Sequence, residues 1–430
     1  MATALWGFAA LFGLLAIGLP AGFAMAVVGF CGFAAIVGVG PAAALAGQIV
    51  YDNATNFSFS VLPMFILMGT LIARSGLSHE LFEAAAAFLG HRRAGLAYAT
   101  VLASGAFSAV CGSSAATTAT MVRVGYPAMR ARNYGDEIAT GAVAVGGTLG
   151  ILIPPSTVMI LYGVLTETNI LHLFAAGFIP GGVAILCHFV AIWVMGLLFP
   201  DAAPKAERVA WARRGRAVMK VWGIVLLFVV MMGGIYLGIF TPTEGGAVGA
   251  AGALLFAATK GGLSLREFIA IVEEATRTTA MMFVILFGAV YLGNFLEVSG
   301  FTSTLGDFVV GLDLGASGTM LVVFGIYLVL GCFIESISMM FLTVPLFFPI
   351  AMALGFDPVW FGILVIVAIE ISLITPPIGL NVFIMRGLIP WVPLRTMFLG
   401  VTPFVVSSVV LLLLLLFFPD LVTFLPGLLK

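Results

Sequence analysis

Two short clusters of hydroxyl and carboxyl side chains interrupt long apolar stretches of the chain. They read "CGSSAATT" in the first half and "FIESISMM" in the second. The residues that could bind a ligand are Gly112, Ser113, Ser114 and Thr117 in the first cluster, and Glu335, Ser336 and Ser338 in the second. Oxygen atoms of this kind, together with free backbone carbonyls, suit a hard monovalent cation such as sodium. The clusters therefore predict an ion-binding site.

Each cluster is followed by a helix that a proline pair should interrupt, in "GGTLGILIPPST" and "IEISLITPPIGLNVF". Proline has no N–H to donate and disfavours helix at the preceding residue, so both helices should break inside the membrane. Half-helix N-termini at such breaks attract anions. The residues that we assign to the breaks are Gly150, Pro154, Glu370, Thr375, Pro376 and Asn381. The predicted sodium ligands are Ser113, Ser114, Glu335 and Thr375.

Two carboxylates, Glu335 and Glu370, fall within these elements. A charge at the centre of a membrane helix costs about 2.5–3.5 kcal/mol on insertion scales, so such residues are functional candidates by default. Glu335 either binds a cation or proton or is hydrogen-bonded by the serine-rich backbone beside it. Glu370 either takes part in the site or braces the helix break. Because no arginine lies at a predicted tip, a substrate carboxylate would depend on backbone dipoles, hydroxyls and bound cations, or on selection outside this chain.

The composition requires a bilayer to hold these elements. Hydrophobic residues make up 62% of the 430 residues, charged residues only 9%, and the mean hydropathy is +1.21. Apolar runs near the length of a spanning helix recur, without the alternation of a membrane β-barrel. A net charge of −1 with no basic run excludes a nucleic-acid-binding surface. We therefore predict an all-α polytopic membrane protein.

The two halves of the chain align at one fixed offset. Pro154 falls on Pro376 (376 − 154 = 222), and Pro127 falls on Pro349 (349 − 127 = 222). The same offset aligns the two hydroxyl clusters with each other. Agreement of several landmarks in one register predicts an internal repeat.

Charges of opposite sign flank the two clusters. They are Arg92, Arg93, Arg130 and Arg132 around the first, and Asp307, Asp313 and Asp357 around the second. By the positive-inside rule, the first segment enters from the cytoplasm and returns there, and the second enters from the opposite face. We therefore predict an inverted repeat with re-entrant helical hairpins at 94–130 and 314–356 and broken helices at 136–166 and 358–389.

This organisation divides the chain into four parts. Residues 1–56 form N-terminal scaffold helices, 57–200 the first repeat, 201–220 a basic cytoplasmic loop, and 221–430 the second repeat. Pro20 leaves open whether residues 1–40 make one span or two. The amphipathic stretch 79–89 is predicted to lie in the membrane interface as a strut.

Six motifs resemble the large membrane subunit of tripartite ATP-independent periplasmic (TRAP) transporters. They are "FSFSVLPMFILMG", "GSSAATTAT", "GGTLGILIPPS", "LTVPLFFPI", "GFDPVWFGIL" and "LITPPIGLNVF", spread over nearly the whole chain. Glu335 stands where the family commonly has Asp, and Ser372 where it commonly has Gly. One cation site is therefore expected to differ in geometry.

The resemblance implies an elevator-type transporter in the bacterial inner membrane, with sodium ions for coupling and no other cofactor. It also implies a small four-helix membrane subunit, supplied here by a separate chain, and a periplasmic binding protein that delivers substrate. In the family the tips and breaks form the binding site, which falls here on Gly112, Ser113, Ser114, Gly150, Glu335, Ser336, Thr375, Pro376 and Asn381.

The expected function is sodium-coupled import of a small carboxylate-containing solute. The alternative within transport is a stand-alone sodium/dicarboxylate symporter that needs no binding protein. An intramembrane enzyme is disfavoured because the chain has no H-E-x-x-H motif, no Asp-rich diphosphate-binding run and no soluble catalytic segment. No residue selects among C4-dicarboxylates, keto acids and sugar acids.

Overall fold

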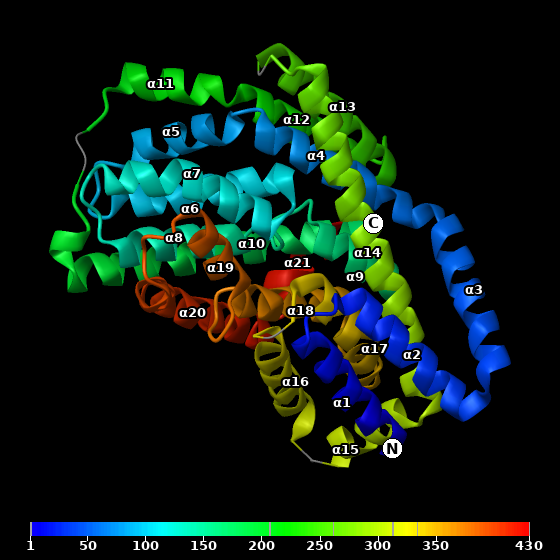
Figure 1. Ribbon diagram of the computed structural model, residues 1–430. Coiled ribbons are helices and arrows are strands. Elements are labelled where there is room, and N and C mark those ends of the chain that lie inside the picture. Colours follow the sequence, from blue (N-terminus) through cyan, green and yellow to red (C-terminus); the bar gives the residue numbers. More distant parts are fainter. Residues whose placement is uncertain (1, 206–207, 261, 312–313, 333, 430) are drawn as a thin grey trace.

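The computed structural model describes residues 2–205, 208–260, 262–311, 314–332 and 334–429, and all regular structure in these ranges is helical (Figure 1). Helical segments there that are long and apolar enough to cross a bilayer are Phe57–Arg74, Ile170–Leu198, Leu265–Val298, Ser336–Ala353 and Leu394–Phe417. A sixth is added if Trp211–Lys220 and Trp222–Tyr236, which meet at 48°, count as one bent span. The prediction of an all-α polytopic membrane protein is confirmed at this level.

The N-terminal region forms separate helices rather than one long span. They are α1 (Ala2–Ala16), α2 (Ala21–Val37) and α3 (Val39–Thr55). The break between α1 and α2 contains Gly18, whose φ is +87°, followed by Pro20. Pro20 precedes the first residue of α2, a position where its missing N–H costs the helix nothing.

Helix α2 packs closely along α14 (Leu265–Val298) because small residues face it. A Cβ on Gly22 would lie 2.8 Å from the backbone nitrogen of Ile285, and one on Gly29 would lie 2.7 Å from that of Leu292. Small residues that let two backbones approach are typical of helix pairs in membranes. Helix α14 has 34 residues, about 51 Å at 1.5 Å per residue. It therefore extends beyond a hydrocarbon core of about 30 Å.

We call the group of helices that packs around α14 the first body; α2 and α3 belong to it. The 3₁₀ turn η1 (Phe57–Ser60) leads into α4 (Val61–Arg74), which packs on α13 (Pro242–Lys260) and on α14. The other members are α12 (Trp222–Tyr236) and α15 (Phe301–Gly311). Figure 1 shows α2, α3, α13 and α14 together on one side of the molecule.

The second body contains the segments that were predicted to form the hairpins and the broken helices. Its first-half helices are α6 (Gly95–Cys111), α7 (Ser114–Arg130), α8 (Asp136–Thr148), α9 (Thr157–Leu165) and α10 (Ile170–Leu198). Its second-half helices are α16 (Gly315–Gly331), α17 (Ser336–Ala353), α18 (Pro358–Ser372), α19 (Leu380–Leu388), α20 (Leu394–Phe417) and α21 (Asp420–Leu428). Helix α8 packs against α6, α7 and α20, so the two halves interdigitate. Asp313, used above in the charge argument, and residue 333 of the second hairpin lie outside the described residues.

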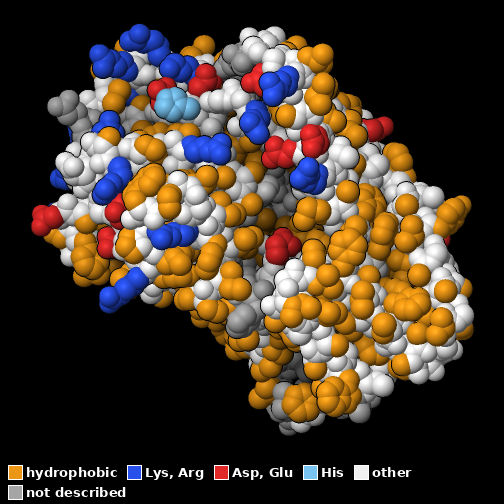
Figure 2. Space-filling view, in the orientation of Figure 1, with side chains coloured by type: hydrophobic (Ala, Val, Ile, Leu, Met, Phe, Trp, Pro, Cys, Tyr) orange, Lys and Arg blue, Asp and Glu red, His pale blue; other side chains and the backbone are white. Residues whose placement is uncertain are grey.

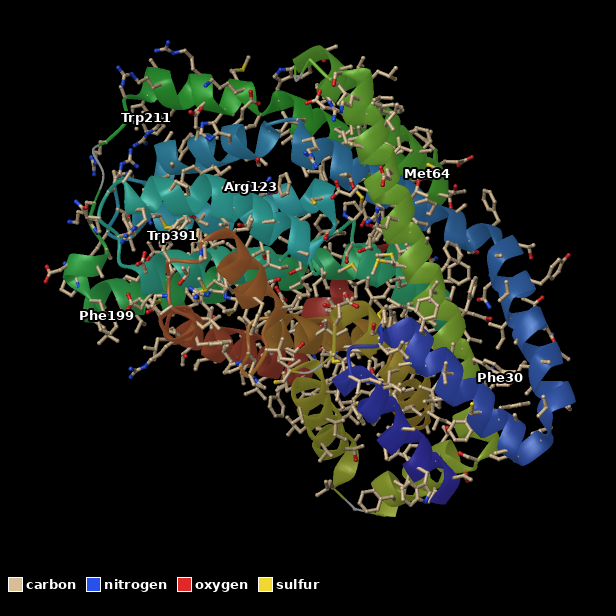
Figure 3. All side chains as sticks on the ribbon, in the orientation of Figure 1. Phe30, Met64, Arg123, Phe199, Trp211 and Trp391 are labelled. Atoms are coloured by element: carbon tan, nitrogen blue, oxygen red, sulfur yellow. The ribbon has the colours of Figure 1, made fainter. Side chains whose placement is uncertain are left out.

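The segment 201–220, predicted as a basic cytoplasmic loop, is partly helical. A 3₁₀ turn, η2 (Pro200–Ala202), is followed by α11 (Trp211–Lys220), while residues 206–207 of the segment lie outside the described ranges. Helix α11 packs on α5 (Leu77–Leu89), and Trp211 lies at the outer edge of the molecule (Figure 3). Figure 2 shows Lys and Arg side chains gathered over this part of the molecule. The helix forms because its polar and apolar residues separate onto two faces, which a count of charges does not reveal.

Candidate functional site

The first hydroxyl cluster forms a tight turn between α6 and α7. Gly112 follows the last residue of α6 in the left-handed conformation, with φ of +63°, and Ser113 then turns to extended backbone. The Ser113 hydroxyl accepts a hydrogen bond from the backbone N–H of Ala116 (3.4 Å) and so caps α7. A Cβ on Gly112 would lie 2.8 Å from the carbonyl oxygen of Pro155, so glycine is required here for both its φ and its size.

The second cluster places a carboxylate where the first has a hydroxyl. Glu335 is the N-cap of α17, and its Oε2 accepts hydrogen bonds from the backbone N–H (3.2 Å) and hydroxyl (3.4 Å) of Ser338. Ser113 and Glu335 are equivalent in the repeat register (335 − 113 = 222). Both are therefore oxygen-bearing caps at the start of the second arm of a hairpin.

The first broken helix is tied to the first tip. Helix α8 ends at Thr148, the Pro154–Pro155 peptide is cis, and Ser156 caps α9. The Thr157 hydroxyl donates a hydrogen bond to the carbonyl oxygen of Gly112 (3.0 Å). The break therefore satisfies a peptide group that the end of α6 leaves unpaired.

The second broken helix reaches the first tip from the other half of the chain. Helix α18 ends at Ser372, the Pro376–Pro377 peptide is cis, and Asn381 lies in the first turn of α19. The Ser114 hydroxyl donates to Oδ1 of Asn381 (3.1 Å), and the Asn381 amide donates to the carbonyl oxygen of Ala144 (3.2 Å). Asn381, which is fully buried, thus joins α19 to both α7 and α8.

The two breaks also meet directly. The Thr148 hydroxyl lies 2.8 Å from Oε1 of Glu370, whose side chain is buried. The second carboxyl oxygen of Glu370 has no hydrogen-bond partner in the described parts of the chain. The bond favours the bracing role for Glu370 over direct contact with a solute.

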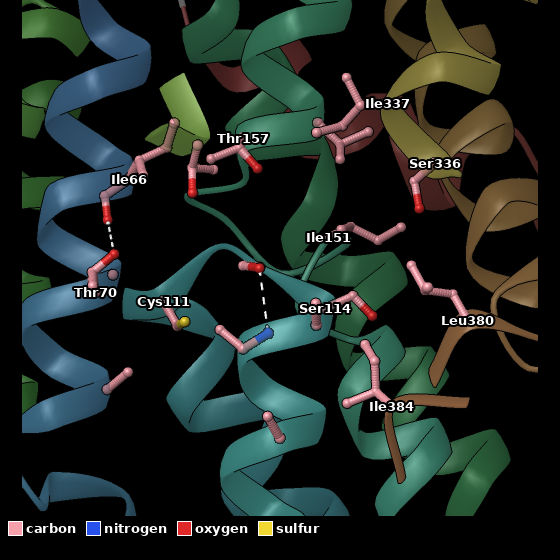
Figure 4. Close-up of a pocket in the computed structure, with 18 of the residues that line it drawn as sticks. Ile66, Thr70, Cys111, Ser114, Ile151, Thr157, Ser336, Ile337, Leu380 and Ile384 are labelled. Atoms are coloured by element: carbon pink, nitrogen blue, oxygen red, sulfur yellow. Dashed lines mark hydrogen bonds between the residues drawn. The ribbon is translucent and has the colours of Figure 1, made fainter. Parts of the chain in front are cut away.

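A cavity of about 480 Å³ lies between the two tips and the first body. Four predicted site residues line it: Ser113, Ser114, Glu335 and Ser336. Figure 4 shows Ser114 and Ser336 around the pocket, with Ile66 and Thr70 of α4 on another side. The structure therefore brings together oxygen-bearing residues from hairpin tips more than 200 residues apart in the sequence.

The other predicted site residues do not line this cavity. They are Gly112, Thr117, Gly150, Pro154, Ser338, Glu370, Thr375, Pro376 and Asn381. Gly150 supports the tip, since a Cβ there would lie 2.7 Å from the carbonyl group of Ser113. The Thr375 hydroxyl donates back to the carbonyl oxygen of Ile371 (2.7 Å), and Pro376 is exposed. Thr117 is buried within α7, with no hydrogen-bond partner for its hydroxyl in the described residues.

Sequence reasoning missed the polar residues that α4 and α14 contribute to the cavity. They are Thr70, Arg74, Glu274 and Thr278. Arg74 and Glu274 form an ion pair (3.4 Å). One signal was available, because the sequence places Arg74 as the first basic residue after a long apolar stretch. No local feature of the sequence predicts that Glu274 lies beside Arg74.

The donor set of the cavity suits a cation bound by hydroxyl, carbonyl and single carboxylate oxygens. Within the described residues, no three His, Cys, Asp or Glu side chains gather as a metal-binding group. Glu335 and Glu274 are the acidic residues among those that line the cavity.

Comparison with known families agrees with the geometry. The family described as "Tripartite ATP-independent periplasmic transporter, DctM component" matches residues 8–421. The chain belongs to this family. The expectation drawn from the six motifs is therefore confirmed.

Named relatives of this TRAP permease carry different solutes. The C4-dicarboxylate TRAP transporter large permease of Pseudomonas aeruginosa is 34% identical over 83% of this chain and 86% of its own length. The sialic acid TRAP large permease of Vibrio cholerae is 31% identical over 97% of this chain and 96% of its own. The isethionate TRAP permease DctMQ of Oleidesulfovibrio alaskensis is 31% identical over 88% of this chain and 60% of its own.

Solved structures support the fold class. The YdaH transporter of Alcanivorax borkumensis superposes with a TM-score of 0.54 at 17% identity, over 84% of this chain and 86% of that chain. MtrF of Neisseria gonorrhoeae gives a TM-score of 0.55 at 12% identity, over 90% and 86%. At this identity the likeness concerns architecture alone.

Proposed function

We propose that this TRAP permease imports a small carboxylate-containing anion, driven by sodium ions that bind at the hairpin tips. The observation that carries the proposal is the shared cavity, which joins Ser113 and Ser114 of one tip to Glu335 and Ser336 of the other. The relatives' names support an anionic solute, since C4-dicarboxylates, sialic acid and isethionate are all anions.

The charge of the cavity supports the proposal of sodium coupling. The Glu335 carboxylate would repel an anion, and the neighbouring hydroxyls would bind it only weakly. A cation that neutralises the carboxylate first removes this repulsion. We propose that sodium binds between Ser113, Ser114 and Glu335, with Thr375 as a further ligand after local rearrangement. The bound cation then raises the affinity of the same cavity for an anion.

An elevator movement fits the division into two bodies. The hairpins and broken helices interlock through Asn381 and the Thr148–Glu370 bond. The helices α2, α13 and α14 pack with α4 into the other body. We propose that the first set slides as a unit against the second in the bacterial inner membrane, with hairpins that are re-entrant. The basic surface over α5, α7 and α11 supports a cytoplasmic assignment for that side (Figure 2).

The proposed partners are a separate small membrane subunit and a periplasmic binding protein. The isethionate relative is named DctMQ, and this chain covers only 60% of its length, so an additional region is joined to the permease there. We propose that a second chain supplies the corresponding region here.

The test is reconstitution with the small subunit and the binding protein. We expect uptake of labelled succinate, pyruvate or N-acetylneuraminate to need an inward sodium gradient and to be unaffected by ATP. Glu335→Gln should keep the cap of α17 but raise the sodium concentration for half-maximal uptake. Uptake that is equal when potassium replaces sodium would contradict the coupling, and uptake without the binding protein would favour the stand-alone symporter.

A further inference from the structure

Arg74 is the one Lys or Arg among the described residues that line the cavity. It ends α4, and its Nη2 lies 3.4 Å from Oε2 of Glu274 on α14. Both side chains remain largely exposed, at 62% for Arg74 and 56% for Glu274. A single, largely exposed positive charge therefore lines the same cavity as Glu335.

The ion pair is weak enough to exchange partners. Exposed pairs of this kind contribute about 0–1 kcal/mol, because water screens both charges. A guanidinium binds carboxylates through a planar pair of N–H donors, and a second carboxylate can replace the first without loss of geometry. An anion that reaches the cavity can therefore compete with Glu274 for the guanidinium.

The position of the Arg74–Glu274 ion pair relates it to one side of the membrane. Helices α4 and α14 pack in the first body, whereas Ser113 and Glu335 lie on the tips of the second. Arg74 precedes α5, and Glu83 of α5 bonds Lys220 of α11 (3.0 Å) on the basic side. Arg74 therefore ends the helix that leads into α5 on this basic side.

We propose that Arg74 binds the carboxylate of the transported anion on the cytoplasmic side of the membrane, and that Glu274 competes for the same guanidinium. The inference rests on the proposed function, since it assigns a specificity residue to the same cavity. Substrate release then becomes an exchange of carboxylates: Glu274 returns to Arg74 as the anion leaves. No group needs to change its charge in this exchange.

The test measures affinity from each side of the membrane. In proteoliposomes, binding protein added outside selects transporters in one orientation. Exchange of external labelled anion is then measured at increasing concentrations of unlabelled anion inside. The internal half-saturation is the internal anion concentration that gives half-maximal exchange. The anion is whichever of succinate, pyruvate and N-acetylneuraminate the wild type takes up. We expect Arg74→Ala to raise the internal half-saturation by up to about fivefold, as for loss of a solvent-exposed ion pair. The external half-saturation should stay unchanged.

Two further variants decide the case if Arg74→Ala does not fold. Glu274→Gln should lower the internal half-saturation, because it frees the guanidinium, and Arg74→Lys should give an intermediate value. Arg277→Ala is the matched control: this residue lies on α14 outside the cavity lining and pairs with Glu273 (3.1 Å). Its internal half-saturation should equal that of the wild type.

The outcomes separate this inference from the proposed function. Wild-type transport with unchanged internal half-saturation in Arg74→Ala, or in Glu274→Gln if the alanine variant is unfolded, would overturn the role of Arg74. Absence of sodium-dependent uptake in the wild type would instead overturn the proposed function.

Discussion

The hydroxyl of Thr148 lies 2.8 Å from a carboxyl oxygen of Glu370, and the two residues are 222 positions apart. This is the offset that aligns the two proline pairs, so residues at matching positions of the two halves touch each other. Thr148 Oγ1 also lies 2.8 Å from the carbonyl oxygen of Val145. One hydroxyl proton serves only one acceptor, and a protonated carboxyl of Glu370 would donate the second bond.

Glutamine at position 370 should therefore be tolerated. Its amide can donate to the Thr148 hydroxyl and fills the same volume, so we expect Glu370→Gln to keep the thermal midpoint of the purified protein. Glu370→Ala should destabilise by about 1–3 kcal/mol, since it leaves a buried partner unpaired. Fluorescence-detected thermal unfolding in detergent measures both. Equal decreases of the thermal midpoint in Glu370→Gln and Glu370→Ala would contradict the bracing role of Glu370.

Gly150 should be sensitive to a single added methyl group. Alanine there would bring Cβ to 2.7 Å from the carbonyl group of Ser113, so the first tip must move. Overpacking of this kind costs about 1–3 kcal/mol. We expect Gly150→Ala to raise the sodium concentration for half-maximal uptake. Gly182→Ala is the control, because a Cβ at Gly182 meets no atom within 4 Å; equal behaviour of the two variants would refute the prediction.

The side chains of Asn381 and Ser114 should contribute to stability jointly rather than independently. Their hydrogen bond (3.1 Å) joins α19 to the first tip. In a double-mutant cycle, we expect Ser114→Ala and Asn381→Ala to lower stability non-additively, with a coupling of about 0.5–3 kcal/mol as for residues in direct contact. Thermal midpoints of the four proteins give the comparison. Strictly additive losses would mean that the bond contributes nothing.

Arg214 should hold α11 against α5. It is buried, and its guanidinium carbon lies 5.6 Å from the ring centre of Phe88 and 4.7 Å from that of Trp211. Such contacts contribute about 0.5–2 kcal/mol. We expect Arg214→Ala to speed trypsin cleavage at the remaining basic residues of α11. Arg213→Ala removes an exposed arginine from the same helix and should not do so.

The residue ranges predicted for hairpins and broken helices can be compared with the observed helices. The ranges 94–130 and 136–166 contain α6 to α9, and 358–389 contains α18 and α19. Helix ends of this kind can be predicted from sequence because glycine, proline and hydroxyl caps affect backbone conformation only within a few residues along the chain. The basic segment 201–220 was predicted from its charge alone, whereas α11, which occupies half of it, depends on a helical periodicity that a count of charges does not reveal.

The sequence by itself determined that the chain is a helical membrane protein, where its helices break, and which oxygen atoms stand at the turns. These follow from hydropathy and local backbone rules, which need no knowledge of distant residues. Only the tertiary structure decided that the two tips share one cavity, that Asn381 meets Ser114, and that Arg74 and Glu274 complete the wall. Such contacts depend on how helices far apart in the chain pack. Small residues such as Gly22 allow a close approach between two helices, but the sequence alone does not identify the partner helix.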